Sequence, residues 1–141
     1  MIQKKILLID DDLSILKLLE INLLNAGYNI ITATAGESGI EKVKEHNPNL
    51  IILDVMLPSI NGFEVCKVLK EDIKTKHIPV IILTGISIST LNEHKKNALD
   101  LGANDYMTKP FDMDDLLNRA KTLIDCEPEC NIDPGLYVNN I

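Results

Sequence analysis

Short runs of apolar residues alternate along this chain with stretches in which apolar and polar positions recur at helical spacing. Runs such as Leu50–Leu53 and Val80–Leu83 contain no polar alternation, which is typical of parallel strands covered on both faces. Strands that alternate with amphipathic helices indicate an α/β domain with a doubly wound parallel sheet. The pattern predicts strands at about 5–10, 29–34, 50–54, 79–84 and 104–108, and helices at about 13–26, 36–46, 62–72, 91–101 and 112–124.

The first expected helix carries more apolar residues than one buried face requires. Leu18 and Ile21 lie on one flank of its main apolar stripe. Two interpretations remain open for this pair: a wide buried face, or a docking surface for another protein. The stripe itself is expected to face the core, and it consists of Ile15, Leu16, Leu19, Leu23 and Ala26.

Charged and hydroxyl side chains stand where the predicted strands end. Asp10 and Asp11 follow the first strand, Asp54 follows the third, Thr84 ends the fourth, and Lys109 follows the fifth. In an open parallel sheet, the carboxyl ends of neighbouring strands meet at one crevice. We therefore expect these side chains to lie close together, as a cluster of acids with one lysine.

Each of these residues has an ordinary explanation when it is taken alone. Asp54 would be a helix cap or a loop acid, and Asp12 is best interpreted as the N-cap of the first helix. As a group, however, the residues indicate phosphoryl chemistry. A carboxylate at the end of a central strand can attack phosphorus and form an acyl phosphate. The adjacent pair Asp10 and Asp11 offers the oxygen ligands that Mg²⁺ prefers.

The composition narrows the class of protein further. The net charge is −7, so nucleic acid is not expected as a direct ligand. No apolar stretch has the length needed to span a bilayer, and the first residues lack the pattern of a signal peptide. The three cysteines, an odd number, suggest no disulfide framework, with Cys126 and Cys130 as free thiols. We therefore predict a cytoplasmic protein with no membrane partner.

Four segments, taken in order, resemble the receiver domain of two-component response regulators. The resemblance runs from residue 4 to about residue 124. It predicts a receiver domain at 1–124, followed by an acidic C-terminal tail at 125–141, in a single-domain response regulator. The segments are Ile-Leu-Leu-Ile-Asp-Asp-Asp from residue 6, Leu-Ile-Ile-Leu-Asp-Val-Met-Leu-Pro-Ser-Ile-Asn-Gly-Phe-Glu-Val from residue 50, Pro-Val-Ile-Ile-Leu-Thr-Gly from residue 79, and Gly-Ala-Asn-Asp-Tyr-Met-Thr-Lys-Pro-Phe from residue 102.

The resemblance implies a fold and a phosphorylation site. The fold would be a flavodoxin-like five-stranded parallel sheet of order 2-1-3-4-5. Asp54 would receive a phosphoryl group from a histidine kinase or a histidine phosphotransferase. Mg²⁺ would be held by Asp11, Asp54 and the backbone carbonyl of Met56, with Asp10 acting mostly through water.

The resemblance also implies how the structure would respond to phosphorylation. Thr84 and Lys109 would contact the phosphoryl group, and the peptide bond that joins Lys109 to Pro110 would be cis. Tyr106 would be an aromatic switch whose ring moves inward when Thr84 is drawn to the phosphate. The result would be altered binding of a downstream protein partner. The protein would then be a switch and not an enzyme, beyond its own phosphorylation and dephosphorylation.

One departure from the family and two alternatives accompany this interpretation. Lys109 lies 25 positions after Thr84, about three more than the family pattern leads us to expect, with the surplus at 86–90. The main alternative is a phosphatase with an aspartyl-phosphate intermediate, whose nucleophile would lie at the first strand, where Asp10-Asp11-Asp12 is found. A pseudo-receiver without phosphorylation is the other, and the complete set of site residues argues against it.

Overall fold

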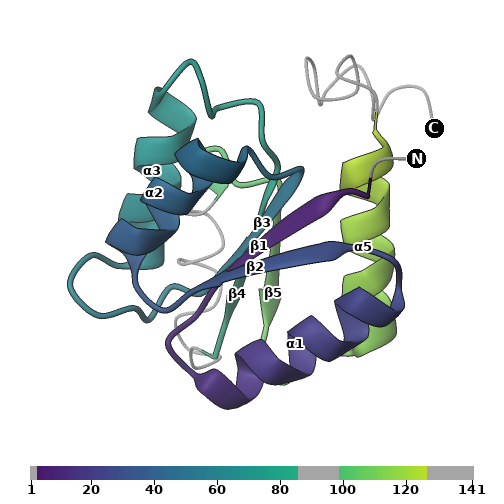
Figure 1. The fold of residues 1–141 in the computed structure, drawn as a ribbon. Coiled ribbons are helices and arrows are strands. Elements are labelled where there is room, and N and C mark those ends of the chain that lie inside the picture. The colour runs from purple at the N-terminus through teal and green to yellow at the C-terminus, as the bar shows by residue number, and fades with distance from the viewer. Residues whose placement is uncertain (1–2, 86–98, 127–141) are drawn as a thin grey trace.

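The computed structural model describes residues 3–85 and 99–126 of the 141-residue chain, and they form a five-stranded parallel sheet with helices on both faces (Figure 1). The strand order is β2-β1-β3-β4-β5, as the family resemblance implied. Chain order therefore reverses between β1 and β3, which is the place where doubly wound sheets bind their ligands. The strands are β1 (Lys5–Ile9), β2 (Asn29–Ala33), β3 (Leu50–Leu53), β4 (Val80–Thr84) and β5 (Asp105–Thr108).

The helices divide between the two faces of the sheet (Figure 1). Helices α1 (Leu13–Asn25) and α5 (Met113–Asp125) cover one face. Helices α2 (Gly36–His46) and α3 (Gly62–Glu71) cover the other. Within the described residues, no helix has both the length and the apolar character needed to cross a membrane.

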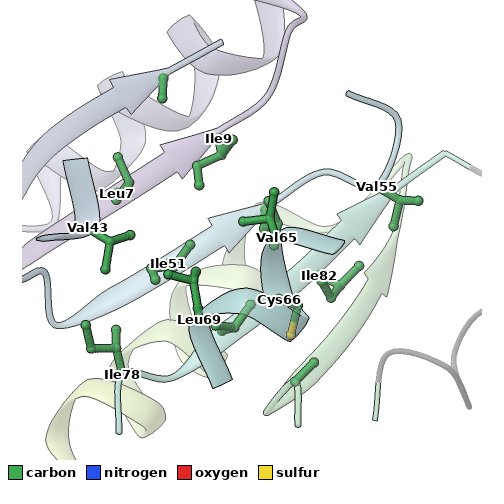
Figure 2. Close-up of a cluster of buried hydrophobic side chains, with 14 of the residues drawn as sticks. Leu7, Ile9, Val43, Ile51, Val55, Val65, Cys66, Leu69, Ile78 and Ile82 are labelled. Carbon is green, nitrogen blue, oxygen red and sulfur yellow. The ribbon is translucent and has the colours of Figure 1, made fainter. Parts of the chain in front are cut away.

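Two hydrophobic clusters, one on each face, hold the layers together. Leu7, Ile51 and Ile82 point toward α2 and α3, where Val43, Val65 and other side chains cover them (Figure 2). Successive strand residues point to opposite faces, so Ile6, Leu8 and Ile52 pack against α1 and α5 instead. Because both faces are covered, β3 and β4 are buried along their whole length, which explains their unbroken apolar sequence.

The predicted element boundaries agree with the structure to within one residue wherever the chain is described. The expected helix at 91–101 lies mostly outside the described residues. One core prediction was wrong: Ala26 is exposed, because α1 ends at Asn25 and Ala26 forms its C-cap. Gly27 follows with φ +102, a backbone conformation that side chains disfavour, and this turns the chain into β2.

The structure rules out the first interpretation of the apolar flank of α1, a wide buried face. Leu16, Leu19 and Leu23 are buried, as predicted. Leu18 and Ile21, in contrast, are each 48% exposed. The buried face is therefore not wide enough to include them, and α1 presents large apolar side chains to solvent.

Candidate functional site

The register of the sheet brings the predicted site residues to one edge. Ile9 is paired with Leu53, so Asp10 and Asp54 leave neighbouring strands at the same level. The backbone N–H of Asp54 donates to the carbonyl of Ile9 at 2.9 Å, which extends the pairing up to the site. On the other side, the N–H of Lys109 donates to the carbonyl of Thr84 at 2.7 Å.

Three carboxylates meet at this edge. Asp10, Asp11 and Asp54 each offer an oxygen, and these oxygens lie within 4.8 Å of one another. Asp10 and Asp54 are only 3% and 5% exposed, whereas Asp11 is exposed. The local backbone fixes the two buried acids, because the N–H of Asp12 donates to Asp10 Oδ1 at 2.9 Å and the N–H of Met56 donates to Asp54 Oδ1 at 3.3 Å.

Lys109 follows the edge strand β5 and extends into this group of acids. Its Nζ lies 2.8 Å from Asp10 Oδ2 and 3.6 Å from Asp54 Oδ2. Burial disfavours the charged amine, but the hydrogen bond to Asp10 and the charges of both acids outweigh it, so the pKa of Lys109 is raised. The peptide bond between Lys109 and Pro110 is cis. The closer pairing with Asp10 is a feature that sequence reasoning missed, because chain order does not say which acid the amine reaches.

The cluster of acids carries more negative than positive charge. Burial, followed by the charge of Asp10, raises the pKa of Asp54 to about 6, while Lys109 acts in the opposite direction. One lysine faces three acids. A small divalent cation with oxygen ligands would compensate this excess, so the donor set fits Mg²⁺.

Two buried hydroxyl groups on β4 and β5 have no hydrogen-bond partner among the described residues. They are Thr84 Oγ1 and the phenol oxygen of Tyr106. Ile82 pairs with Tyr106 across the β4–β5 ladder, and Ile82 and Thr84 share a face of the sheet, so the two hydroxyl-bearing residues lie on the same face. Burial raises the pKa of the Tyr106 phenol. Unpaired buried polar groups are uncommon in folded proteins, so these two hydroxyl groups call for a functional explanation.

Comparison with known proteins identifies the family. The model of the response regulator receiver domain matches residues 6–121. The chain belongs to this family. It is 43% identical over 121 residues to PhoP of Bacillus subtilis, the alkaline phosphatase synthesis transcriptional regulatory protein, covering 86% of this chain and 48% of PhoP. It is 42% identical over 120 residues to RpaA of Synechocystis, a DNA-binding transcriptional regulator, covering 85% of this chain and 48% of RpaA.

Solved structures support the same assignment. A CheY-like receiver domain protein from Methanospirillum hungatei superposes with a TM-score of 0.81 at 30% sequence identity, covering 91% of this chain and 98% of that one. The CheY4 chemotaxis protein of Vibrio cholerae gives a TM-score of 0.79 at 30% identity, covering 86% of this chain and 99% of CheY4. The chain thus matches single receiver domains along nearly their full length, while it spans about half the length of the curated relatives it matches.

Gly62 lies against the backbone of Asp54, and sequence reasoning assigned this glycine no role. A Cβ on Gly62, the first residue of α3, would collide with the backbone carbonyl oxygen of Asp54. The N–H of Gly62 donates to the carbonyl of Val55 at 2.9 Å, which closes the loop after β3. The sequence signal was the Asn61-Gly62 pair at a helix start, where Asn61 is the N-cap.

We expect the metal-free receiver to lose stability as the pH rises from about 4 to about 6. The pKa of Asp54 is raised from its ordinary value of 3.8 to about 6 in the folded protein, so the folded state binds this proton more tightly than the unfolded state. Its ionisation therefore disfavours folding, and the effect is complete above pH 6. Urea unfolding in EDTA at pH 4.5 and pH 7.5 measures it for the parent and for Asp54→Asn.

The Asp54→Asn variant serves as the reference because it keeps every other titrating group. The unfolding free energy of the variant, relative to the parent, should be higher at pH 7.5 than at pH 4.5. The same difference at both values would mean that Asp54 does not titrate in this range.

Proposed function

We propose that this receiver domain accepts a phosphoryl group on Asp54, with Mg²⁺, from a histidine kinase or a histidine phosphotransferase. The observation that carries the proposal is the convergence of Asp10, Asp11, Asp54 and Lys109 at the carboxyl edge of the sheet. Uptake of one phosphate per chain from a small phosphodonor, measured as intact mass, tests it.

Each group has a defined part in the transfer. A carboxylate oxygen of Asp54 forms the new bond to phosphorus, while the P–N bond of the phosphohistidine breaks and its electron pair returns to the imidazole. Asp10, Asp11 and Asp54, with the backbone carbonyl of Met56, would hold Mg²⁺. When bound, the ion supplies the positive charge that lets one anion approach another. Lys109 Nζ, already 3.6 Å from Asp54, would neutralise a phosphoryl oxygen.

The proposed output is a two-state change read by another protein. Thr84 Oγ1 would donate to the phosphoryl group, and Tyr106 would respond to the movement of Thr84. The two unpartnered buried hydroxyls support this assignment, because a phosphoryl oxygen would give Thr84 the acceptor it lacks among the described residues. The phosphate shifts the equilibrium only as far as it favours one arrangement by such contacts.

We expect beryllofluoride, which mimics an acyl phosphate, to move amide NMR signals well beyond the residues it touches. The signals of Thr84 and of Leu99 to Phe111 should shift, because β5 and its flanking segments carry Tyr106. The signals of Leu18 to Leu24 on α1 should barely move and serve as the internal control. Shifts confined to the site itself would mean that no switch propagates and that the domain only carries phosphate.

We expect the acyl phosphate to be comparatively long-lived. Met56 lies two residues beyond Asp54 and is 65% exposed, so it flanks the open side of the site. Its thioether neither orients nor activates water. Met56→Asn, which can hold a water by hydrogen bonds, should raise the hydrolysis rate by about tenfold, below the 10²–10⁴ of a well-placed general base. Ile86, two residues beyond Thr84, is expected from the sequence to flank the same approach, and it lies outside the described residues.

The rate is measured as the loss of phosphate mass after the donor is removed. The control is Val68→Asn, which changes an exposed apolar residue on α3, far from Asp54 in sequence, and should hydrolyse as the parent does. Leu57→Asn would be unsuitable because Leu57 packs against the core. Equal hydrolysis rates in the parent and in Met56→Asn would show that the side chain of Met56 does not keep hydrolysis slow.

The phosphatase alternative gains no comparable support. Its nucleophile would lie at the end of β1, where Asp10 is paired with Lys109 and accepts the N–H of Asp12. The amine of Lys109 lies closer to Asp10, at 2.8 Å, than to Asp54, at 3.6 Å. The relatives, moreover, are described as regulators. Those relatives are about twice as long as the region aligned with this chain. We propose a protein partner as the effector that responds to the switch.

A further inference from the structure

A pocket of about 890 Å³ lies at the amino edge of the sheet, opposite the edge that holds Asp54. Its walls are the three segments that lead into β3, β4 and β5, together with the ends of α3 and α5. Apolar side chains line part of it, among them Ile78, Leu101 and Leu123. The pocket is large enough for a small ligand or a short peptide segment, and the proposed phosphotransfer makes no use of it.

The basic side chains of this pocket have no acidic partner among the described residues. Lys70 Nζ donates to two backbone carbonyls, at 3.1 and 2.6 Å, and to Asn104 Oδ1 at 3.2 Å, and all three acceptors are uncharged. Burial lowers the pKa of the Lys70 amine. Lys76 and His77 are exposed at the rim, and no salt bridge joins either of them to an acid in the described part of the chain. The lining contains a single acid, Asp100, so this place is locally basic in a protein whose net charge is −7.

The C-terminal segment of the chain begins at the edge of the pocket. Helix α5 ends at Asp125, and Figure 1 shows this end of α5 near the start of β1, at the amino edge. The C-cap Cys126 lines the pocket and has an extended backbone, with φ −67° and ψ 130°. Pro128 favours the same extended backbone at Glu127. The segment that follows contains no lysine or arginine and carries three acids, Glu127, Glu129 and Asp133.

We propose that residues 127–133 of this chain dock in the pocket at the amino edge, with their acidic side chains toward Lys76 and His77. The tether favours this occupant. Glu129 is three residues beyond Cys126, a reach of at most about 10 Å, so its carboxylate stays near the rim at a high effective concentration. Exposed ion pairs are weak, so this local concentration, and not the strength of any one contact, fills the pocket.

Lys70 would act on the docked segment through its charge. Its three N–H donors are already used by the two carbonyls and by Asn104, so the direct contacts fall to Lys76 and His77. Docking would close the pocket to other ligands and hold the chain beyond Cys126 against the amino edge. The inference is independent of the phosphoacceptor role, because Asp54 lies at the opposite edge of the sheet.

The same acidic segment of a second copy of this chain would make the same contacts between molecules. The net charge of −7 on each copy opposes that association, whereas the tether within one chain needs no encounter. The two arrangements differ in their dependence on protein concentration. Amide signals of the pocket should therefore be the same in dilute and in concentrated samples of the parent, and a change with concentration would overturn docking within one chain.

Neutralising two acids of the segment tests the inference in the full chain. In ¹⁵N-labelled protein, Glu127→Gln with Glu129→Gln should shift the amides of Lys76, His77 and Asn104, which lie more than 20 positions earlier in the sequence. High salt should move the same amides of the parent in the same direction, because it screens the charge pairs. Shifts confined to the neighbours of the substituted residues would mean that the segment does not dock.

The matched control removes two acids elsewhere. Glu41→Gln with Glu64→Gln changes exposed acids on α2 and α3 that do not line the pocket, so the amides of Lys76, His77 and Asn104 should keep their positions. Equal shifts of these amides in the control and in the tail variant would show an effect of net charge alone and would overturn the proposal.

A pair of lysine variants tests the pocket side. Lys76→Gln should shift the amides of residues 127–133, because it removes the charge that these acids meet at the rim. Lys74→Gln should leave them in place, since Lys74 is exposed in the same segment before β4 but does not line the pocket. If Lys76→Gln and Lys74→Gln had the same effect on the amides of 127–133, the pocket would not be the docking site.

Discussion

Asp54→Asn should abolish phosphate uptake from a small phosphodonor, whereas the parent should take up a single phosphate. Asp54 follows the central strand β3, is 5% exposed, and lies beside the acids that follow β1 and 3.6 Å from the amine of Lys109. An amide in its place keeps the shape of the side chain but lacks the anionic oxygen that attacks phosphorus. Intact mass after incubation with the donor and Mg²⁺ measures the result.

The matched control is Asp12→Asn, two positions beyond Asp10. Asp12 accepts the N–H groups of Ser14 and Ile15 as the N-cap of α1, and Asn caps helices about as well as Asp. This variant should therefore fold and take up phosphate as the parent does. Uptake by Asp54→Asn equal to that of the parent would place the phosphate elsewhere and end the assignment of Asp54.

Mg²⁺ should both stabilise the fold and be required for phosphorylation. Without the ion, Asp10, Asp11 and Asp54 repel one another at separations within 4.8 Å, and Lys109 compensates only part of their charge. A ligand that binds only the folded state stabilises it by mass action, by about 2.7 kcal/mol at one hundred times its dissociation constant. For a domain of this size that corresponds to a rise of roughly 8 °C in Tm.

Thermal unfolding with and without Mg²⁺ measures the first effect, and phosphate uptake in EDTA measures the second. Asp11→Asn tests the site directly, because Asp11 is exposed and its loss should cost little stability in the metal-free protein. This variant should lose most of the stabilisation by Mg²⁺. The metal assignment would be wrong if Mg²⁺ left the Tm of the parent unchanged and EDTA did not slow phosphorylation.

Much of this domain could be predicted from its sequence because the relevant signals are local. Unbroken apolar runs mark β3 and β4 as strands that are covered on both faces, and the structure places the ends of these strands within one residue of the prediction. The positions of Asp10, Asp54, Thr84 and Lys109 at strand ends were equally local. Parallel strands have their carboxyl ends at one edge, so the convergence of these side chains followed from the fold class alone.

The prediction for Ala26 failed for an equally local reason. Helical spacing shows neither where a helix ends nor whether neighbouring layers still cover its last residue. Ala26 is the C-cap and is exposed, although it continues the pattern of Leu19 and Leu23.

Other features were decided only by the tertiary structure, because they depend on distances between segments far apart in the chain. Lys109 lies 3.6 Å from Asp54, but packing brings its amine closer to Asp10, 99 positions earlier, at 2.8 Å. Helical periodicity left Leu18 and Ile21 undecided between core and surface, and only the fit of α1 onto the sheet exposes them. The burial that raises the pKa of Asp54 to about 6 and leaves Thr84 without a partner among the described residues likewise arises from the packed layers. The sequence by itself determined which chemical groups stand at the edge of the sheet, because the type of a side chain and its position at the end of a strand are properties of the chain. The pairing and the exposure of these groups depend on how the layers pack.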